Sequence, residues 1–119
     1  MSVFQSVLAI TLAYFLTQAP ESITGNVVAV HQGDTFTIQS LPPNDNLYKV
    51  RLSNIDTPEL TQPFGLQAKE YTETHILWES IEVKYNMVDL YGRLVGSVAF
   101  PKGGVLNEAL VQSGLAWHY

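Results

Sequence analysis

The chain of 119 residues contains no cysteine, so it can form neither a disulfide framework nor a metal site made of thiolates. Basic residues are also scarce: Lys and Arg number 6 against 11 Asp and Glu, and the formal net charge is −5. A nucleic-acid binder is usually basic, because attraction to phosphate speeds association. The charge therefore argues against tight non-specific DNA binding. It does not exclude an enzyme that reaches phosphate through a metal ion and a few arginines.

No apolar run reaches the length of about 20 residues that crosses a membrane comfortably. Residues 3–16 are nearly all apolar, and no Lys or Arg occurs before Lys49. The run has the length of a signal-peptide core, and Thr17-Gln18-Ala19 resembles a small-residue cleavage site. Residues 1–21 are therefore predicted to be an export signal or membrane anchor, which indicates a secreted or membrane-anchored extracytoplasmic protein. The alternative is a structural helix, which would indicate a cytoplasmic one.

Residues 22–119 have the composition and length of one globular domain. Alternating and β-branched patterns predict strands over residues 27–30, 35–38, 48–52, 81–85 and 94–100. Helical spacing predicts helices over residues 66–77 and 105–113, the second ended by Gly114. Five short strands interrupted by a helix predict an α+β, mainly β domain: a five-stranded OB-fold barrel with packed helices.

Three carboxylates, those of Asp34, Asp56 and Glu59, are candidates for a metal-dependent hydrolytic site. Asp34 and Asp56 are short acids on expected turns, where their oxygens can converge on a hard cation such as Ca²⁺ or Mg²⁺. Thr57 can add its backbone carbonyl, because Pro58 stiffens the same turn. Glu59 is one carbon longer and can reach a water beside the metal. Each of these acids alone has a simpler explanation as a turn residue, so the prediction depends on the whole set.

Two arginines complete the set. Arg51 ends an expected strand just before the acidic turn, and Arg93 follows a glycine in the segment Asp89-Leu90-Tyr91-Gly92-Arg93. One guanidinium group can bind two oxygens of a phosphate at once. Both arginines are predicted to face one phosphate. Taken singly, a strand arginine usually makes a weak surface salt bridge. Asp89 is predicted to be a hairpin-turn residue rather than a ligand.

These segments resemble the thermonuclease-type, or staphylococcal nuclease-like, domain. The matching motifs occur in the family's order over roughly residues 24–119: residues 30–35, 50–59, 62–65 with Ala68, 89–93 and 107–115. The resemblance implies an OB-type barrel and Ca²⁺-dependent cleavage of DNA and RNA that leaves 3′-phosphates. The expected partner is a DNA or RNA substrate, and the chain is expected to be a monomer.

The resemblance assigns a role to each matched position. It implies that Asp34, Asp56 and the Thr57 carbonyl bind the metal and that Glu59 is the general base. Arg51, Arg93 and Tyr91 match the phosphate-binding arginines and a tyrosine near the nucleotide.

Two positions depart from the family pattern. Gln32 stands where the family often has an acid, and Leu90 stands where a basic residue can assist phosphate binding. The alternative function is a catalytically inactive module that binds nucleic acid or protein. Such a module need not keep the acids and arginines together, so their joint presence favours an enzyme.

Overall fold

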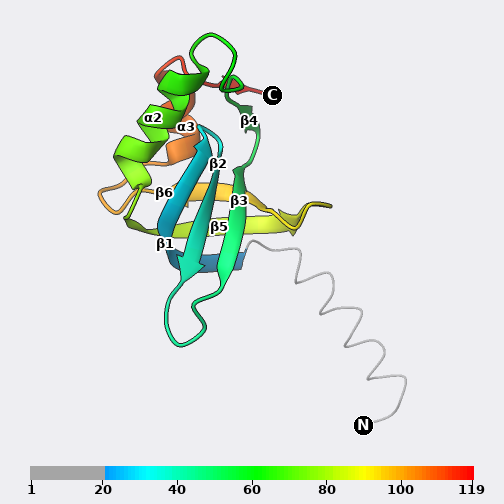
Figure 1. Ribbon diagram of the computed structural model, residues 1–119, viewed down its shortest axis with the longest axis vertical. Coiled ribbons are helices and arrows are strands. Elements are labelled where there is room, and N and C mark those ends of the chain that lie inside the picture. Colours follow the sequence, from blue (N-terminus) through cyan, green and yellow to red (C-terminus); the bar gives the residue numbers. More distant parts are fainter. Residues whose placement is uncertain (1–20) are drawn as a thin grey trace.

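The computed structural model describes residues 21–119, which form a closed barrel of five strands with helices packed against it (Figure 1). Around the barrel the strands follow the order β1, β2, β3, β6 and β5. Neighbouring strands are antiparallel, except for the parallel pair of β3 and β6. The bounds are β1 Glu21–Gln32, β2 Thr35–Ser40, β3 Leu47–Leu52, β5 Ser80–Val88 and β6 Leu94–Ala99. The predicted α+β class and five-stranded OB-type barrel are confirmed.

Alternation along the strands fills the barrel. In β6, Leu94, Gly96 and Val98 are buried while the residues between them are partly exposed, and β5 buries Ile81 and Val83 in the same way. A side chain at position 96 has no room, because a Cβ there would lie 2.1 Å from the carbonyl oxygen of Lys84. In these two strands, the alternation seen in the sequence is therefore the alternation between residues that face the core and residues that face outward.

β1 is much longer than the strand predicted over residues 27–30. Its first half pairs with β5, with Glu21 opposite Tyr85, and its second half pairs with β2, with Gln32 opposite Thr35. One curved strand thus serves two neighbours and closes the barrel. The early part of β1 is rich in Ser, Thr and Asn and half exposed, so it carries no apolar run that would mark it in the sequence.

The two predicted helices are present within one residue of their expected bounds. α2 spans Gly65–Ile76 and buries Ala68, Thr72 and Ile76, while α3 spans Leu106–Gln112. Gly114 follows α3 with φ +75°, the left-handed conformation expected of a glycine that ends a helix. Both helices lie toward one end of the barrel, and the same end carries the turn between β1 and β2 (Figure 1).

A short ribbon outside the barrel was not predicted. β4 (Ile55–Asp56) pairs antiparallel with β7 (Trp117–His118), and the Tyr119 N–H donates to the Asn54 carbonyl at 3.2 Å. Two-residue strands are too short to show a period of two, which explains why the sequence pattern misses them. The ribbon attaches the C-terminal residues to the strand that carries Asp56.

Within residues 21–119 no helix has the length and apolar character needed to cross a membrane. The predicted export signal or anchor over residues 1–21 lies almost entirely outside the described residues.

Candidate active site

Asp34 lies in the two-residue turn between β1 and β2, with only 4% of its surface exposed. Its Oδ1 accepts the Thr35 hydroxyl at 2.9 Å, and its Oδ2 accepts the Thr57 N–H at 3.1 Å. Its backbone carbonyl accepts the Leu52 N–H at 2.9 Å. These bonds fix the carboxylate between β2, the end of β3 and the loop after β4.

The turn itself is held against α2. The Thr72 hydroxyl donates to the Gly33 carbonyl at 2.6 Å in a buried contact. A Cβ at Gly33 would lie 2.8 Å from the Ala68 Cβ and 2.9 Å from the Thr57 Cγ2. A glycine is therefore required beside Asp34 because helix and loop close on the backbone from both sides.

Arg51 joins the two predicted metal-binding acids. One terminal nitrogen donates to the carbonyls of Leu52 at 2.6 Å and Ile55 at 2.9 Å and lies 3.4 Å from Asp34 Oδ2. The other terminal nitrogen forms an ion pair with Asp56 Oδ1. The Arg51 side chain is 15% exposed, so water solvates its positive charge poorly and these partners must stabilise it instead. The structure thus brings Asp34, Asp56 and Arg51 into one cluster.

The oxygens of this cluster suit a hard cation. Asp34 and Asp56 converge on one guanidinium, so their oxygens are close enough to share a positive charge. Thr57, in the loop after β4, is buried, and its hydroxyl oxygen has no hydrogen-bond partner among the described residues. No group of three or more His, Cys, Asp or Glu suited to a metal occurs within residues 21–119. A cation would therefore use the two carboxylates together with neutral oxygens such as the Thr57 carbonyl.

Glu59 stands beside the cluster on the exposed loop that follows β4. Its carboxylate Oε2 accepts a hydrogen bond from the Gln32 side-chain amide at 2.8 Å. Its backbone N–H donates to the Gln62 side-chain carbonyl at 2.7 Å. The sequence pattern gave Gln32 only as a departure from the family and did not reveal that it contacts Glu59.

Arg93 and Tyr91 lie at the turn between β5 and β6. The Arg93 Nε donates to Asp89 Oδ2 at 2.7 Å, and the Arg93 guanidinium carbon lies 5.4 Å from the centre of the Tyr91 ring. Asp89 Oδ1 accepts the N–H groups of Tyr91 and Arg93, each at 2.9 Å. The prediction that Asp89 is a turn residue is confirmed. Burial of the Asp89 carboxyl acts to raise its pKa, but the hydrogen bonds from Arg93 and Tyr91 outweigh that effect and hold the pKa below its ordinary value.

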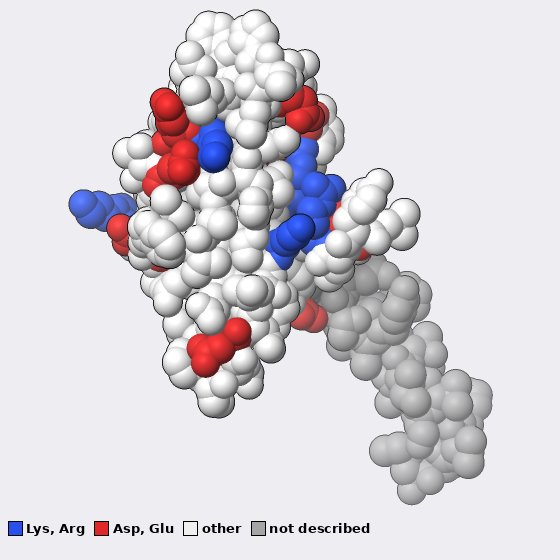
Figure 2. Space-filling model, in the orientation of Figure 1, with Lys and Arg blue, Asp and Glu red and all other residues white. Residues whose placement is uncertain are grey.

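The two arginines share one outer face of the barrel. Val50 and Leu94 are direct partners in the parallel pair of β3 and β6, and both are buried. Arg51 follows Val50 and Arg93 precedes Leu94, so both side chains belong to the opposite, outer face. Figure 2 shows Lys and Arg atoms gathered beside β3 with Asp and Glu atoms close to them. The structure is thus compatible with one phosphate near both arginines.

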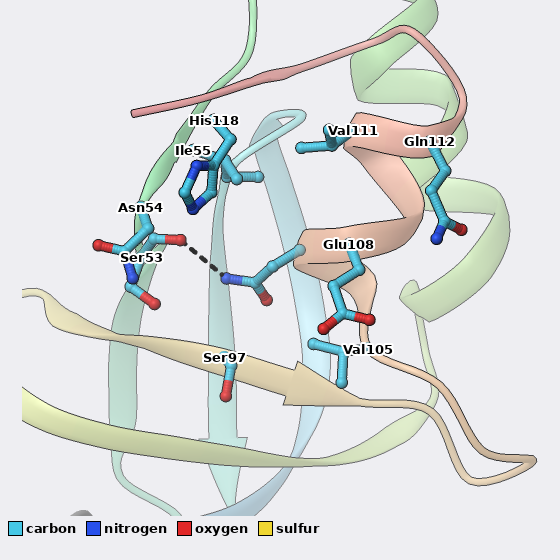
Figure 3. Close-up of a pocket in the computed structure, with 10 residues that line it drawn as sticks. Ser53, Asn54, Ile55, Ser97, Val105, Glu108, Val111, Gln112 and His118 are labelled. Atoms are coloured by element: carbon cyan, nitrogen blue, oxygen red, sulfur yellow. Dashed lines mark hydrogen bonds between the residues drawn. The ribbon is translucent and has the colours of Figure 1, made fainter.

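A pocket of about 440 Å³ lies on the other side of the turn between β3 and β4 (Figure 3). None of the predicted site residues lines it. Ile55 connects the two regions: its side chain lines the pocket, while its carbonyl accepts a hydrogen bond from Arg51. His118, the partner of Ile55 in the ribbon, also lines the pocket, so Asp56 and its partner Trp117 belong to the opposite face of that ribbon.

Asn107 is a structural residue whose role the sequence did not reveal. Its side-chain amide donates to the Ser53 carbonyl at 3.1 Å, a bond drawn in Figure 3, and to the Gly96 carbonyl at 3.2 Å. Its side-chain oxygen accepts the Val98 N–H at 3.2 Å. α3 is thereby tied to β6 and to the turn that precedes Asp56.

Comparisons with known proteins identify a family and several relatives. Residues 49–119 match the family described as staphylococcal nuclease homologue. A protein of Escherichia coli O157:H7 named uncharacterized endonuclease is 34% identical over 97 residues, which are 82% of this chain and 61% of that protein. A micrococcal nuclease of Shigella flexneri is 35% identical over 103 residues, covering 80% of this chain and 58% of its own length.

A third relative is an uncharacterized endonuclease of Haemophilus influenzae, 32% identical over 99 residues, which are 83% of this chain. This chain spans between 54% and 61% of the length of these three proteins. Asp34 and Gln32 precede the residues matched by the family model, and the fold places them beside Arg51 and Glu59.

Asp89→Asn is expected to lower the free energy of unfolding at neutral pH, because the ionised carboxylate accepts three hydrogen bonds in the turn. Folding lowers the pKa of Asp89, so the stabilisation is fully present above the unfolded pKa of about 3.9 and is lost as the pH falls through the folded value. Urea unfolding of both proteins at pH 7, 5 and 3 should therefore show a difference that shrinks in acid. Asp45→Asn, in an exposed loop, is the matched control; a difference that stays constant with pH would contradict the assignment.

Proposed function

Because this chain belongs to the staphylococcal nuclease homologue family, we propose that it is a nuclease that hydrolyses phosphodiester bonds of DNA, RNA or both with the help of Ca²⁺, leaving 3′-phosphates. The observation that carries the proposal is the convergence of Asp34 and Asp56 on Arg51, next to Glu59 and on the same outer face as Arg93. The nuclease names of the bacterial relatives support the reaction class.

The donor set favours Ca²⁺ over Zn²⁺. Asp34, Asp56 and the Thr57 carbonyl offer only oxygen, and neither His nor Cys belongs to the cluster. Bound there, the cation would supply Lewis-acid chemistry at the phosphoryl group and lower the pKa of a coordinated water. Arg51 balances the charge of the same carboxylates from the protein side.

Glu59, Arg93 and Tyr91 are each proposed to have a separate role in the reaction. Glu59 is proposed to accept the proton of the attacking water, because it is exposed and lies two residues after Thr57. Arg93 is proposed to bind the phosphoryl oxygens: its Nε is engaged by Asp89, while its two terminal nitrogens donate no hydrogen bond within residues 21–119. Tyr91 is 82% exposed beside Arg93 and is proposed to contact the nucleotide.

The two arginines differ in how many of their guanidinium nitrogens are already bonded to the protein. Both terminal nitrogens of Arg51 are bonded to protein oxygens, whereas those of Arg93 donate no hydrogen bond within residues 21–119. We therefore propose that Arg93 gives the larger transition-state contribution and that Arg51 acts on phosphate while also holding the acidic turn. For residues 1–21 the proposal stays an export signal or membrane anchor, and with it an extracytoplasmic location.

The first test is cleavage of single-stranded DNA, duplex DNA and RNA by the full chain with Ca²⁺ and with a Ca²⁺ chelator. Cleavage should disappear in chelator and return when excess Ca²⁺ is added, because the two carboxylates alone cannot activate water. Asp56→Asn should lose cleavage in Ca²⁺, whereas Asp45→Asn should retain it. Undiminished cleavage in chelator would refute the proposed metal role, and binding of nucleic acid without any cleavage would favour the inactive module.

Arg93→Ala should lower kcat by roughly 10³-fold, the scale on which a positioned guanidinium stabilises a transferring phosphoryl group. Lys102→Ala removes one positive charge from an exposed turn and serves as the matched control. Urea unfolding of both variants separates loss of chemistry from loss of fold. A reduction in kcat of less than about tenfold with the fold intact would show that Arg93 is only a surface charge.

A further inference from the structure

The backbone of Gln32, at the edge of the site, is held in place by the structure around it. Gln32 is the last residue of β1, its backbone pairs with Thr35 across the two-residue turn, and its side chain is partly buried. The turn that follows is fixed by the Thr72 hydroxyl and by the lack of space at Gly33. The frame that fixes Asp34 therefore also fixes the backbone from which the Gln32 side chain extends.

Glu59 has the opposite character. It lies exposed on a loop, and only its backbone is held locally: the Gln62 N–H donates to the Glu59 carbonyl at 2.9 Å, and the Gln62 side chain accepts the Glu59 N–H. Within residues 21–119 the carboxylate of Glu59 receives a single hydrogen bond, from Gln32 Nε2. A glutamate with several rotatable bonds is otherwise free to leave the site, and ordering it carries an entropic cost.

The chemistry of the contact fixes its direction. A carboxylate can only accept, so Gln32 must present its NH₂ group and not its carbonyl. The amide is neutral, so it holds the carboxylate without placing a competing positive charge on it. Only Oε2 is engaged, which leaves Oε1 available to accept a proton from water. An acid at position 32 could not donate and would repel Glu59.

We propose that Gln32 is a positioning residue that holds the Glu59 carboxylate in its working orientation beside the carboxylates of Asp34 and Asp56. The inference rests on the proposed nuclease function and assigns a role to Gln32, a position at which this chain departs from the family pattern. Gln32 does not touch substrate in this account; it acts through Glu59. One short turn between β1 and β2 thus serves both the cation, through Asp34, and the general base, through Gln32.

A kinetic test uses the full chain and a double-mutant cycle. Gln32→Ala should lower kcat on the order of tenfold with KM unchanged, because the substrate still binds while the base is misplaced. Gln32→Met keeps the length of the side chain without the donor and should show a similar loss. In a Glu59→Ala background, Gln32→Ala should change kcat by less than about twofold. Gln39→Ala, at the far end of β2, is the matched control and should retain the starting rate.

Equal losses in both backgrounds would overturn the inference, as would a rise in KM without a fall in kcat. The thermal unfolding temperature of Gln32→Ala should match that of Gln39→Ala, and a large drop would assign Gln32 a structural role instead. If the unaltered chain cleaves no nucleic acid, the proposed function fails first, and a measurement without activity still decides the contact. In ¹⁵N NMR spectra, Glu59→Ala should shift the side-chain NH₂ signals of Gln32 and leave those of Gln39 unchanged; unchanged Gln32 signals would contradict the contact.

Discussion

The site depends on a single guanidinium. Arg51 projects from the end of β3 and bonds to Asp34 from the β1–β2 turn, to Asp56 from β4 and to two backbone carbonyls between them. The Arg51 and Asp34 side chains are 15% and 5% exposed, so their pairing is screened by water less than a surface ion pair, whereas the Asp56 side chain is 41% exposed. The turn between β1 and β2 is thereby held against the segment that runs from β3 to β4, and the other proposed functional groups are arranged around that edge of the barrel.

The same interaction explains how an acidic chain can approach phosphate. Asp34 and Asp56 would repel a phosphodiester, but Arg51 balances part of their charge, and a bound cation would balance more. Arg93 adds positive charge on the same outer face from the turn that precedes β6. Attraction is thus concentrated where the reaction would occur, although the net charge of the chain is −5.

Much of the barrel could be predicted from the sequence because its strands obey simple periodicity. The alternation of Ile81, Val83 and Tyr85 marks β5, and Gly114 marks the end of α3. The first half of β1 could not be predicted, because its pairing with β5 depends on backbone hydrogen bonds and not on apolar side chains. The ribbon of β4 and β7 could not be predicted for a related reason: strands of two residues are too short to show an alternating pattern in the sequence.

The candidate site shows the same division. The acids and arginines could be identified from their chemistry and spacing, and the fold brings Asp34 to Arg51 and Asp56. The contact between Gln32 and Glu59 and the ties made by Asn107 could not be found that way. Both are hydrogen bonds between residues far apart in sequence, and amide side chains are common enough that type alone does not single them out.

The most direct test of this account is the effect of Ca²⁺ on the thermal unfolding of the unaltered chain and of Arg51→Met, each measured by calorimetry in chelator and in excess Ca²⁺. Removing the guanidinium leaves Asp34 and Asp56 facing each other without a counter-charge, so the variant should unfold at a lower temperature in chelator. A cation that binds only the folded protein should then restore it. Ca²⁺ should raise the unfolding temperature of Arg51→Met more than that of the unaltered chain; an equal or smaller rise would contradict the claim that Arg51 and the cation balance the same two carboxylates.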